Sequence, residues 1–227
     1  MQLSADKILE RPMPAFIPDI PVMLAFALAT IVLAITPGPD MALQLSRAIN
    51  YGRAHGVAAM FGAMAGILVH TTLVAFGISV LIVAAPALFF ALKIGGALYL
   101  LFLAYQAIMH GGGLRIAEAA KKPPKVRQSF MTGLGINLLN PKVVLFFMTF
   151  LPQFVDAHDP GATGKLFFLG LEFVALSIPL GLLTVLTADW LTAAFKRSKW
   201  VERALNWSFA AIFTAFAATI LTAQARQ

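Results

Sequence analysis

Proline interrupts two long apolar stretches of this sequence, and each interruption carries residue types that could bind a small charged molecule. The first is Thr36-Pro37-Gly38-Pro39-Asp40 and the second, about 100 residues later, is Asn140-Pro141-Lys142. Proline cannot donate a backbone hydrogen bond and collides with the carbonyl four residues back, so each stretch is expected to divide into two half-helices. Thr36 and Asn140 are good N-cap residues, which predicts that each break is the N-terminus of a second half-helix. Such an end carries unpaired N–H groups and a partial positive charge, which suit an anion such as a carboxylate.

Charged side chains lie deep inside apolar stretches at Asp40, Lys93 and Lys142; a charge there costs about 2.5–3.5 kcal/mol on insertion scales and is a functional candidate by default. Asp40 is interpreted as a carboxylate that takes up a proton or binds an ammonium group; the alternative is a helix cap wetted from the cytoplasm. Lys142 could bind a carboxylate or pair with Asp40, and a purely structural ion pair is the alternative. Lys93 lies about seven residues into its stretch, so it could face the site or extend its stem to the outer surface.

The remaining polar residues inside the apolar stretches support weaker predictions. His70 could relay protons, and the alternative is a packing residue whose hydrogen bonds are satisfied. Glu172 is expected near the outer end of its stretch, with a coupling role as the functional alternative. Asn137 and Gln44 could form hydrogen bonds between helices near the two breaks.

Several classes of chemistry are excluded by the composition. The chain has no cysteine, which excludes disulfides, thiolate metal sites, iron–sulfur clusters and cysteine nucleophiles. Its four histidines fall on different segments, without the His-Glu-x-x-His pair of a zinc enzyme, and the sequence has no Gly-x-Ser-x-Gly nucleophile elbow. Met60 and Met64 share a helix face, but no cysteine or histidine pair accompanies them to bind copper. We therefore predict no metal, no cofactor and no catalytic residue.

The elements that hold these residues are predicted to be membrane helices. Of the 227 residues, 59% are apolar and only 12% are charged, about half the charge of a soluble domain, which excludes an ordinary soluble globule. A spanning helix needs about 20 mainly apolar residues. Six stretches meet that requirement: 20–49, 57–82, 86–109, 129–153, 166–189 and 204–223. The predicted fold class is all-α integral membrane, with six transmembrane helices of which helices one and four are interrupted, and residues 1–19 form an extramembrane tail.

Basic residues cluster in every second connection between these stretches. They are Arg47 and Arg53 in the first cluster, Arg115, Lys121, Lys122, Lys125 and Arg127 in the second, and Lys196, Arg197, Lys199 and Arg203 in the third. By the positive-inside rule these three connections are cytoplasmic, which places both termini outside. Trp190, Trp200 and Trp207 flank the last cluster as an interfacial aromatic belt would. Topology therefore explains the net charge of +7, and no nucleic-acid partner is predicted.

The longest basic connection, 110–128, is interpreted as a cytoplasmic linker between two three-helix repeats, 20–109 and 129–227. An odd number of spans in each half gives the halves opposite orientations, so the repeats would be inverted. Breaks at corresponding positions of the two halves are the best sequence pointer to a transporter's binding site, which we expect near the midplane; two proline kinks filled by packing are the alternative. Gly52-x-x-x-Gly56 and Gly62-x-x-x-Gly66 predict close approach of helices.

At these residues the chain resembles the LysE/RhtB family of bacterial amino-acid exporters, from about residue 22 to the C-terminus. The resemblance is carried by the two breaks and by Ser46-Arg47, Gly52, Arg53, Gly56, Gly66, His70, Lys93, Gly95-Gly96-Ala97, Tyr99-Leu100, Asn137 through Lys142 and Phe150-Leu151-Pro152-Gln153-Phe154. It implies export of amino acids or related small metabolites across the inner membrane. Asp40 occupies a position where many family members would have Asn.

We therefore expect a secondary active transporter that holds a zwitterionic amino acid between the two broken helices. The half-helix N-termini and Lys142 would hold the carboxylate, while Asp40 would meet the ammonium group or exchange a proton. The sequence has no Gly-x-x-x-x-Gly-Lys phosphate loop, so the proton gradient is the expected energy source, with sodium as the alternative. The expected partners are the amino acid, the coupling ion and the lipid bilayer, with a homo-oligomer left open. An intramembrane enzyme and a non-transporting membrane assembly subunit are the alternatives from other classes.

Overall fold

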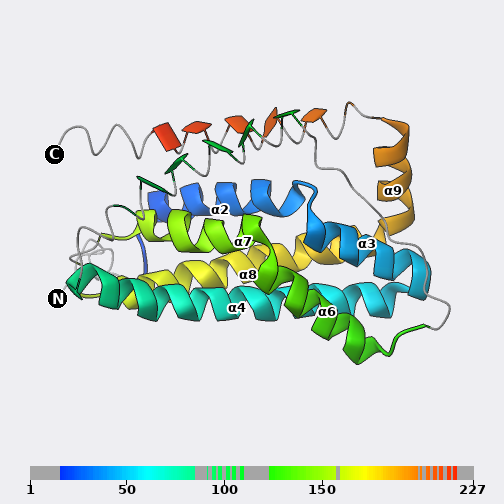
Figure 1. Ribbon diagram of the computed structural model, residues 1–227, viewed down its shortest axis with the longest axis horizontal. Helices are drawn as coiled ribbons and strands as arrows, with labels where there is room; N and C mark the ends of the chain where they lie inside the picture. Colours follow the sequence, from blue (N-terminus) through cyan, green and yellow to red (C-terminus); the bar gives the residue numbers. More distant parts are fainter. Residues whose placement is uncertain are drawn as a thin grey trace, which may run out of the picture.

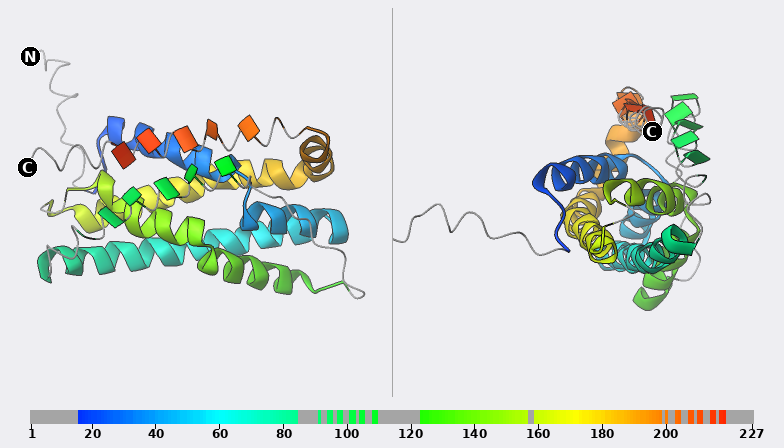
Figure 2. Two further views of the ribbon diagram at one scale, coloured as in Figure 1. Left: turned by 45° about the horizontal axis from the view of Figure 1, so that its top comes forward. Right: turned by 90° about the vertical axis from the view of Figure 1, so that its left-hand side faces the viewer.

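The computed structural model describes residues 16–84, 123–156 and 159–198, together with single residues and pairs within 91–109 and 200–218. All regular structure among these residues is helical, and the long helices run side by side along the length of the molecule (Figure 1). The described residues of 91–109 and 200–218 are also helical and lie along one side of the bundle (Figure 2). The predicted all-α class is therefore confirmed.

The first helices are α2 (Ile20–Ile35), α3 (Pro39–Tyr51) and α4 (Arg53–Ala84). In the later part of the chain the α-helices are α6 (Val126–Leu139), α7 (Pro141–Leu145), α8 (Ala162–Leu186) and α9 (Ala188–Arg197). Between α7 and α8 the chain forms a π-helix, η1 (Phe146–Phe150), and a 3-10 helix, η2 (Leu151–Phe154). The helix α9 occupies part of the segment that the sequence assigned to the connection between the fifth and sixth spans.

Two to four membrane spans are present by length and composition among the described residues. The helices α4, over Arg53–Gly77, and α8 are each long and apolar enough to cross a bilayer. The pair α2 and α3 bends by 51° at its break, and α6 bends by 54° against Pro141–Phe154, so each pair is one broken span or a re-entrant loop. The two predicted interruptions are confirmed, whereas the expected spans 86–109 and 204–223 lie largely outside the described residues.

The first break is made by two prolines, Pro37 and Pro39, with Gly38 between them. Thr36 has extended backbone angles, φ −72° and ψ 124°, as expected of a residue before proline. Its N–H and its hydroxyl both donate to Val32 O, at 3.1 and 2.6 Å, so Thr36 closes α2. The N-cap of α3 is Gly38, with Pro39 in the first turn. The prediction that Thr36 caps the second half-helix is wrong, because α3 starts only at Pro39 and Gly38 therefore occupies the N-cap position.

The second break follows the prediction. Asn140 is extended, with φ −72° and ψ 109°, and its Oδ1 accepts a hydrogen bond from Lys142 N at 3.1 Å. Pro141 occupies the first turn of α7, where its missing N–H costs nothing. Asn140 is thus the N-cap of the second half-helix, as its residue type indicated.

Glycines bring α4 and α6 into backbone contact. A Cβ built on Gly62 would lie 2.0 Å from Phe130 O, and one built on Gly133 would lie 2.1 Å from Ala59 O. A Cβ on Gly66 would lie 2.5 Å from Asn137 Oδ1, so this glycine makes room for a side chain of the second break. The close approach predicted for Gly62 and Gly66 is confirmed, and it sets how the second broken helix meets the bundle.

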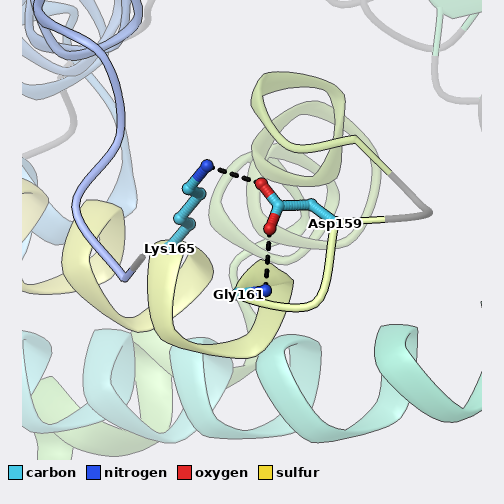
Figure 3. Close-up of polar contacts among 3 residues, drawn as sticks. All are labelled: Asp159, Gly161 and Lys165. Carbon is cyan, nitrogen blue, oxygen red and sulfur yellow. Dashed lines mark hydrogen bonds and ion pairs between the residues drawn. The ribbon is translucent and has the colours of Figure 1, made fainter. Parts of the chain in front are cut away.

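The connection between η2 and α8 is held by Asp159 (Figure 3). Its Oδ1 accepts from Gly161 N at 2.7 Å, and its Oδ2 accepts from the Lys165 ammonium. The hydrogen bond from Lys165 holds the pKa of the Asp159 carboxyl below its usual range. These contacts fix the start of α8, the helix that forms one wall of the cavity described next.

Candidate binding site

Asp40 joins the two breaks, which are 100 residues apart in the sequence. Its Oδ2 accepts hydrogen bonds from Asn137 Nδ2 at 3.0 Å and from Asn140 Nδ2 at 2.9 Å. A carboxylate oxygen can only accept from these amides, so the contact sets their orientation and directs each amide oxygen away from Asp40. The first turn of α3 is therefore tied to the end of α6 and to the start of α7.

Lys142 makes the converse connection, from the second break to the first. Its ammonium donates to Leu33 O at 2.8 Å and to Thr36 O at 2.9 Å. The last carbonyls of a helix have no partner within the helix, and a cation near that end is stabilised by the helix dipole. Lys142 therefore caps the C-terminal end of α2. A Cβ built on Gly38 would lie 3.7 Å from its Nζ, so the ammonium lies close to the Pro-Gly-Pro segment.

His70 contacts the end of α6. Its Nε2 lies 3.4 Å from Asn137 O, and its ring stacks on Phe147 with the centroids 6.0 Å apart. The residue is buried, and it supplies a partner for a carbonyl near the C-terminal end of the helix. These contacts fit the packing alternative for His70; a proton-relay role stays a prediction.

A cavity of about 70 Å³ lies between the two breaks. At 10–15 Å³ per water this is room for about five water molecules, or for the few non-hydrogen atoms of an amino-acid head group. The walls come from both broken helices and from α4 and α8. The polar residues that line it are Thr36, Asp40, Gln44, Asn137, Asn140, Lys142, Ser177 and Thr184.

Three polar atoms on the cavity-lining residues are buried without a hydrogen-bond partner in the described part of the chain. They are Asp40 Oδ1, Asn137 Oδ1 and Ser177 Oγ. Asn137 and Ser177 are only 1% and 4% exposed, so bulk water does not satisfy them. Buried acceptors without partners cost about 1–3 kcal/mol each, and a ligand or water molecule in the cavity that donates hydrogen bonds to them would remove that cost.

Packed aromatic rings beside the cavity form a group that we call the phenylalanine cluster: Phe26, Phe146, Phe147, Phe150, Phe154 and Phe173. Phe173 both lines the cavity and packs on Phe147, with ring centroids 5.1 Å apart. Phe146, Phe147 and Phe150 come from the π-helix η1, a form of helix that often marks functional sites. Its members come from α2, η1, η2 and α8.

The structure thus brings together most of the residues that the sequence singled out. Glu172 is not a lining residue, although its Oε2 is buried without a partner among the described residues. Lys93 lies outside the described residues. Sequence reasoning missed Ser177 and Thr184, for which the available signal was a hydroxyl residue inside the fifth apolar stretch.

Comparison with known proteins gives consistent matches over most of the chain. Residues 31–224 match the family described as LysE type translocator. An uncharacterized membrane protein of Pseudomonas aeruginosa is 32% identical over 210 residues, which cover 87% of this chain and 94% of that protein.

Two further relatives have names that state an activity. The homoserine/homoserine lactone efflux protein of Salmonella typhimurium is 26% identical over 88% of this chain and 96% of that protein. The leucine efflux protein of Klebsiella pneumoniae is 28% identical over 88% of this chain and 95% of that protein. No solved structure matches the chain.

Proposed function

Because this chain belongs to the family of LysE type translocators, we propose that it exports amino acids or closely related small metabolites across the bacterial inner membrane as a secondary active transporter. The members of this family are translocators, so the enzyme alternative is dropped. The observation that carries the proposal is the cavity between two broken helices, lined by Asp40 and by acceptor atoms that have no partner in the described part of the chain.

The proposed architecture has six spans in two inverted repeats, 20–109 and 129–227, joined by a cytoplasmic linker at 110–128. Two observations support it. Each break carries a charged residue directly after its last proline, Asp40 in one half and Lys142 in the other. Each of these residues contacts the opposite break, as expected for repeats related by an axis through the site.

The proposed coupling uses Asp40 as the shared binding group for proton and substrate. One carboxylate oxygen cannot hold a proton and an ammonium group together, so uptake of a proton from outside would release the substrate. Lys142 and His70, the other ionisable groups around the breaks, position the two helix ends through backbone carbonyls. Sodium in place of the proton is the alternative.

Alternating access requires a barrier on each side of the cavity. We assign the outer barrier to the phenylalanine cluster, because Phe173 lines the cavity and Phe154 directly precedes the connection at 155–161, which the charge pattern places outside. Rocking of one half against the other would separate its rings, since Phe26 belongs to the first half and the other members to the second.

The test is uptake into inside-out vesicles with an acidic lumen, using labelled leucine and homoserine. The full chain should accumulate at least one of them when the pH gradient is present, and Asp40→Asn should abolish that accumulation in folded protein. Asp189→Asn is the matched control, since it removes an exposed carboxylate in the first turn of α9 that does not line the cavity, and it should transport normally. No accumulation of any amino acid under a proton or a sodium gradient would refute the proposal.

A further inference from the structure

The cavity offers hydrogen-bond acceptors to a ligand. The Lys142 ammonium, which also lines it, already donates to backbone carbonyls of the protein. Resting on the proposed export function, we infer that the site recognises the α-ammonium group of its substrate and does not require the carboxylate. Amino-acid amides, esters and lactones are then ligands of the same site as the free amino acids.

The acceptor side of the argument comes from three atoms. An ammonium group has three N–H donors, and three buried atoms able to accept, Asp40 Oδ1, Asn137 Oδ1 and Ser177 Oγ, have no partner among the described residues. The amide of Asn137 cannot be turned around to offer a donor instead, because its Nδ2 is bound to the other oxygen of Asp40. Gly66 leaves space for this amide oxygen, since a Cβ built there would lie 2.5 Å from it.

The donor side of the argument is that the side chains of the second break that could bind a carboxylate, Lys142 and Asn140, already donate hydrogen bonds within the protein. The Lys142 ammonium donates to two carbonyls at the end of α2. Asn140 gives its Nδ2 to Asp40 and receives Lys142 N on its Oδ1. The N-terminus of α3 begins with Pro39, which has no N–H, and carries the Asp40 carboxylate in its first turn. A ligand carboxylate at that end would meet a like charge.

The substrates named for two relatives are consistent with recognition of the ammonium group. Homoserine lactone and leucine appear in the names of two relatives. Both compounds carry a primary amine on the carbon that is bonded to the carbonyl carbon. A lactone is a cyclic ester, so it has no free carboxylate. A site built around the ammonium group accommodates both compounds, whereas a site built around a carboxylate accommodates only one.

The test compares three ligands on the purified full chain in lipid nanodiscs. L-leucine has both charges, L-leucinamide keeps only the ammonium group, and N-acetyl-L-leucine keeps only the carboxylate. Dissociation constants from ligand-induced thermal stabilisation should agree within about threefold for leucine and leucinamide, and N-acetyl-leucine should bind at least about 100-fold more weakly. Homoserine and its lactone provide a second pair with the same expectation. The inference is overturned if N-acetyl-leucine binds more tightly than leucinamide, if both bind far more weakly than leucine, or if no primary amine binds.

Two variants separate the roles of the charged residues. Asp40→Asn should weaken leucine and leucinamide alike by about 10- to 100-fold, since it removes a charge-assisted hydrogen bond. Lys142→Met should leave the ratio of the two dissociation constants unchanged in the folded fraction. If Lys142→Met loses affinity for leucine but not for leucinamide, Lys142 binds the carboxylate of the ligand. That result would overturn the inference. The ligand series on the unaltered protein decides the question even if a variant does not fold.

Flux measured on the same preparation distinguishes this inference from the proposed function. Transport of leucine combined with a preference for N-acetyl-leucine would leave export standing and overturn ammonium recognition. Binding of leucinamide that depends on Asp40, combined with no flux of any amino acid, would support ammonium recognition and refute export.

Discussion

Adding one methyl group to Gly62 should destabilise the protein, because the α4 and α6 backbones touch there. The new Cβ would lie 2.0 Å from Phe130 O, and at least 3.0 Å is needed, so the helices must separate by about 1 Å. Overpacking of this kind lowers the free energy of unfolding by about 1–3 kcal/mol. The loss here should lie in the upper part of that range, because backbone atoms must move. The gain in helix propensity from glycine to alanine offsets about 0.5–1 kcal/mol. The net expectation for Gly62→Ala is a loss of about 2 kcal/mol.

Gly135→Ala is the matched control on the same helix pair. A Cβ at Gly135 meets no atom within 4 Å, so this variant should keep only the propensity gain. At about 2–4 °C per kcal/mol, Gly62→Ala should melt about 4–8 °C below the unaltered protein and Gly135→Ala slightly above it. Intrinsic fluorescence or light scattering during heating in one detergent measures both. A Gly62→Ala protein that melts at or above the unaltered protein would refute the predicted contact between α4 and α6.

Three further predictions concern the breaks and the topology. Lys142→Met should lower the melting temperature by several degrees because two carbonyls at the end of α2 lose a charged donor, and Lys142→Arg should lose less; equal melting of all three proteins would contradict the capping role. His70→Gln should keep pH-driven accumulation, since the amide can still donate to Asn137 O, and loss of accumulation in folded protein would point to a proton relay instead. A reporter fused within 110–128 should be cytoplasmic and one fused after Asp156 external, and reversed signals would overturn the predicted orientation.

The positions of both breaks could be predicted because proline acts locally. Pro39 and Pro141 lack an N–H and exclude the preceding residue from helical geometry, whatever the rest of the chain does. Asn140 could be assigned as a cap for the same reason, since its bond to Lys142 N spans two residues. The prediction for Thr36 failed on a local detail: prolines lie on both sides of Gly38, and the second half-helix starts at the later one, Pro39.

The partners of the charged residues could not be predicted, because they depend on how distant helices cross. Asp40 contacts amides 97 and 100 positions away, and Lys142 contacts carbonyls 106 and 109 positions away. No rule about neighbouring residues distinguishes a lysine that holds a carboxylate from one that caps another helix. Ser177 was missed for the same reason, since its place in the cavity depends on the face that α8 presents to the breaks.

The sequence by itself determined that the chain belongs in a bilayer, where its helices break, and which charges lie inside the apolar stretches. These properties follow from composition and from the covalent chemistry of single residues. Only the tertiary structure decided that the Lys142 ammonium donates to backbone carbonyls, while Asp40 and Asn137 each keep an oxygen without a partner among the described residues. That division depends on helix crossings set by backbone contact at Gly62 and Gly133, where many weak contacts between residues far apart in the sequence act together.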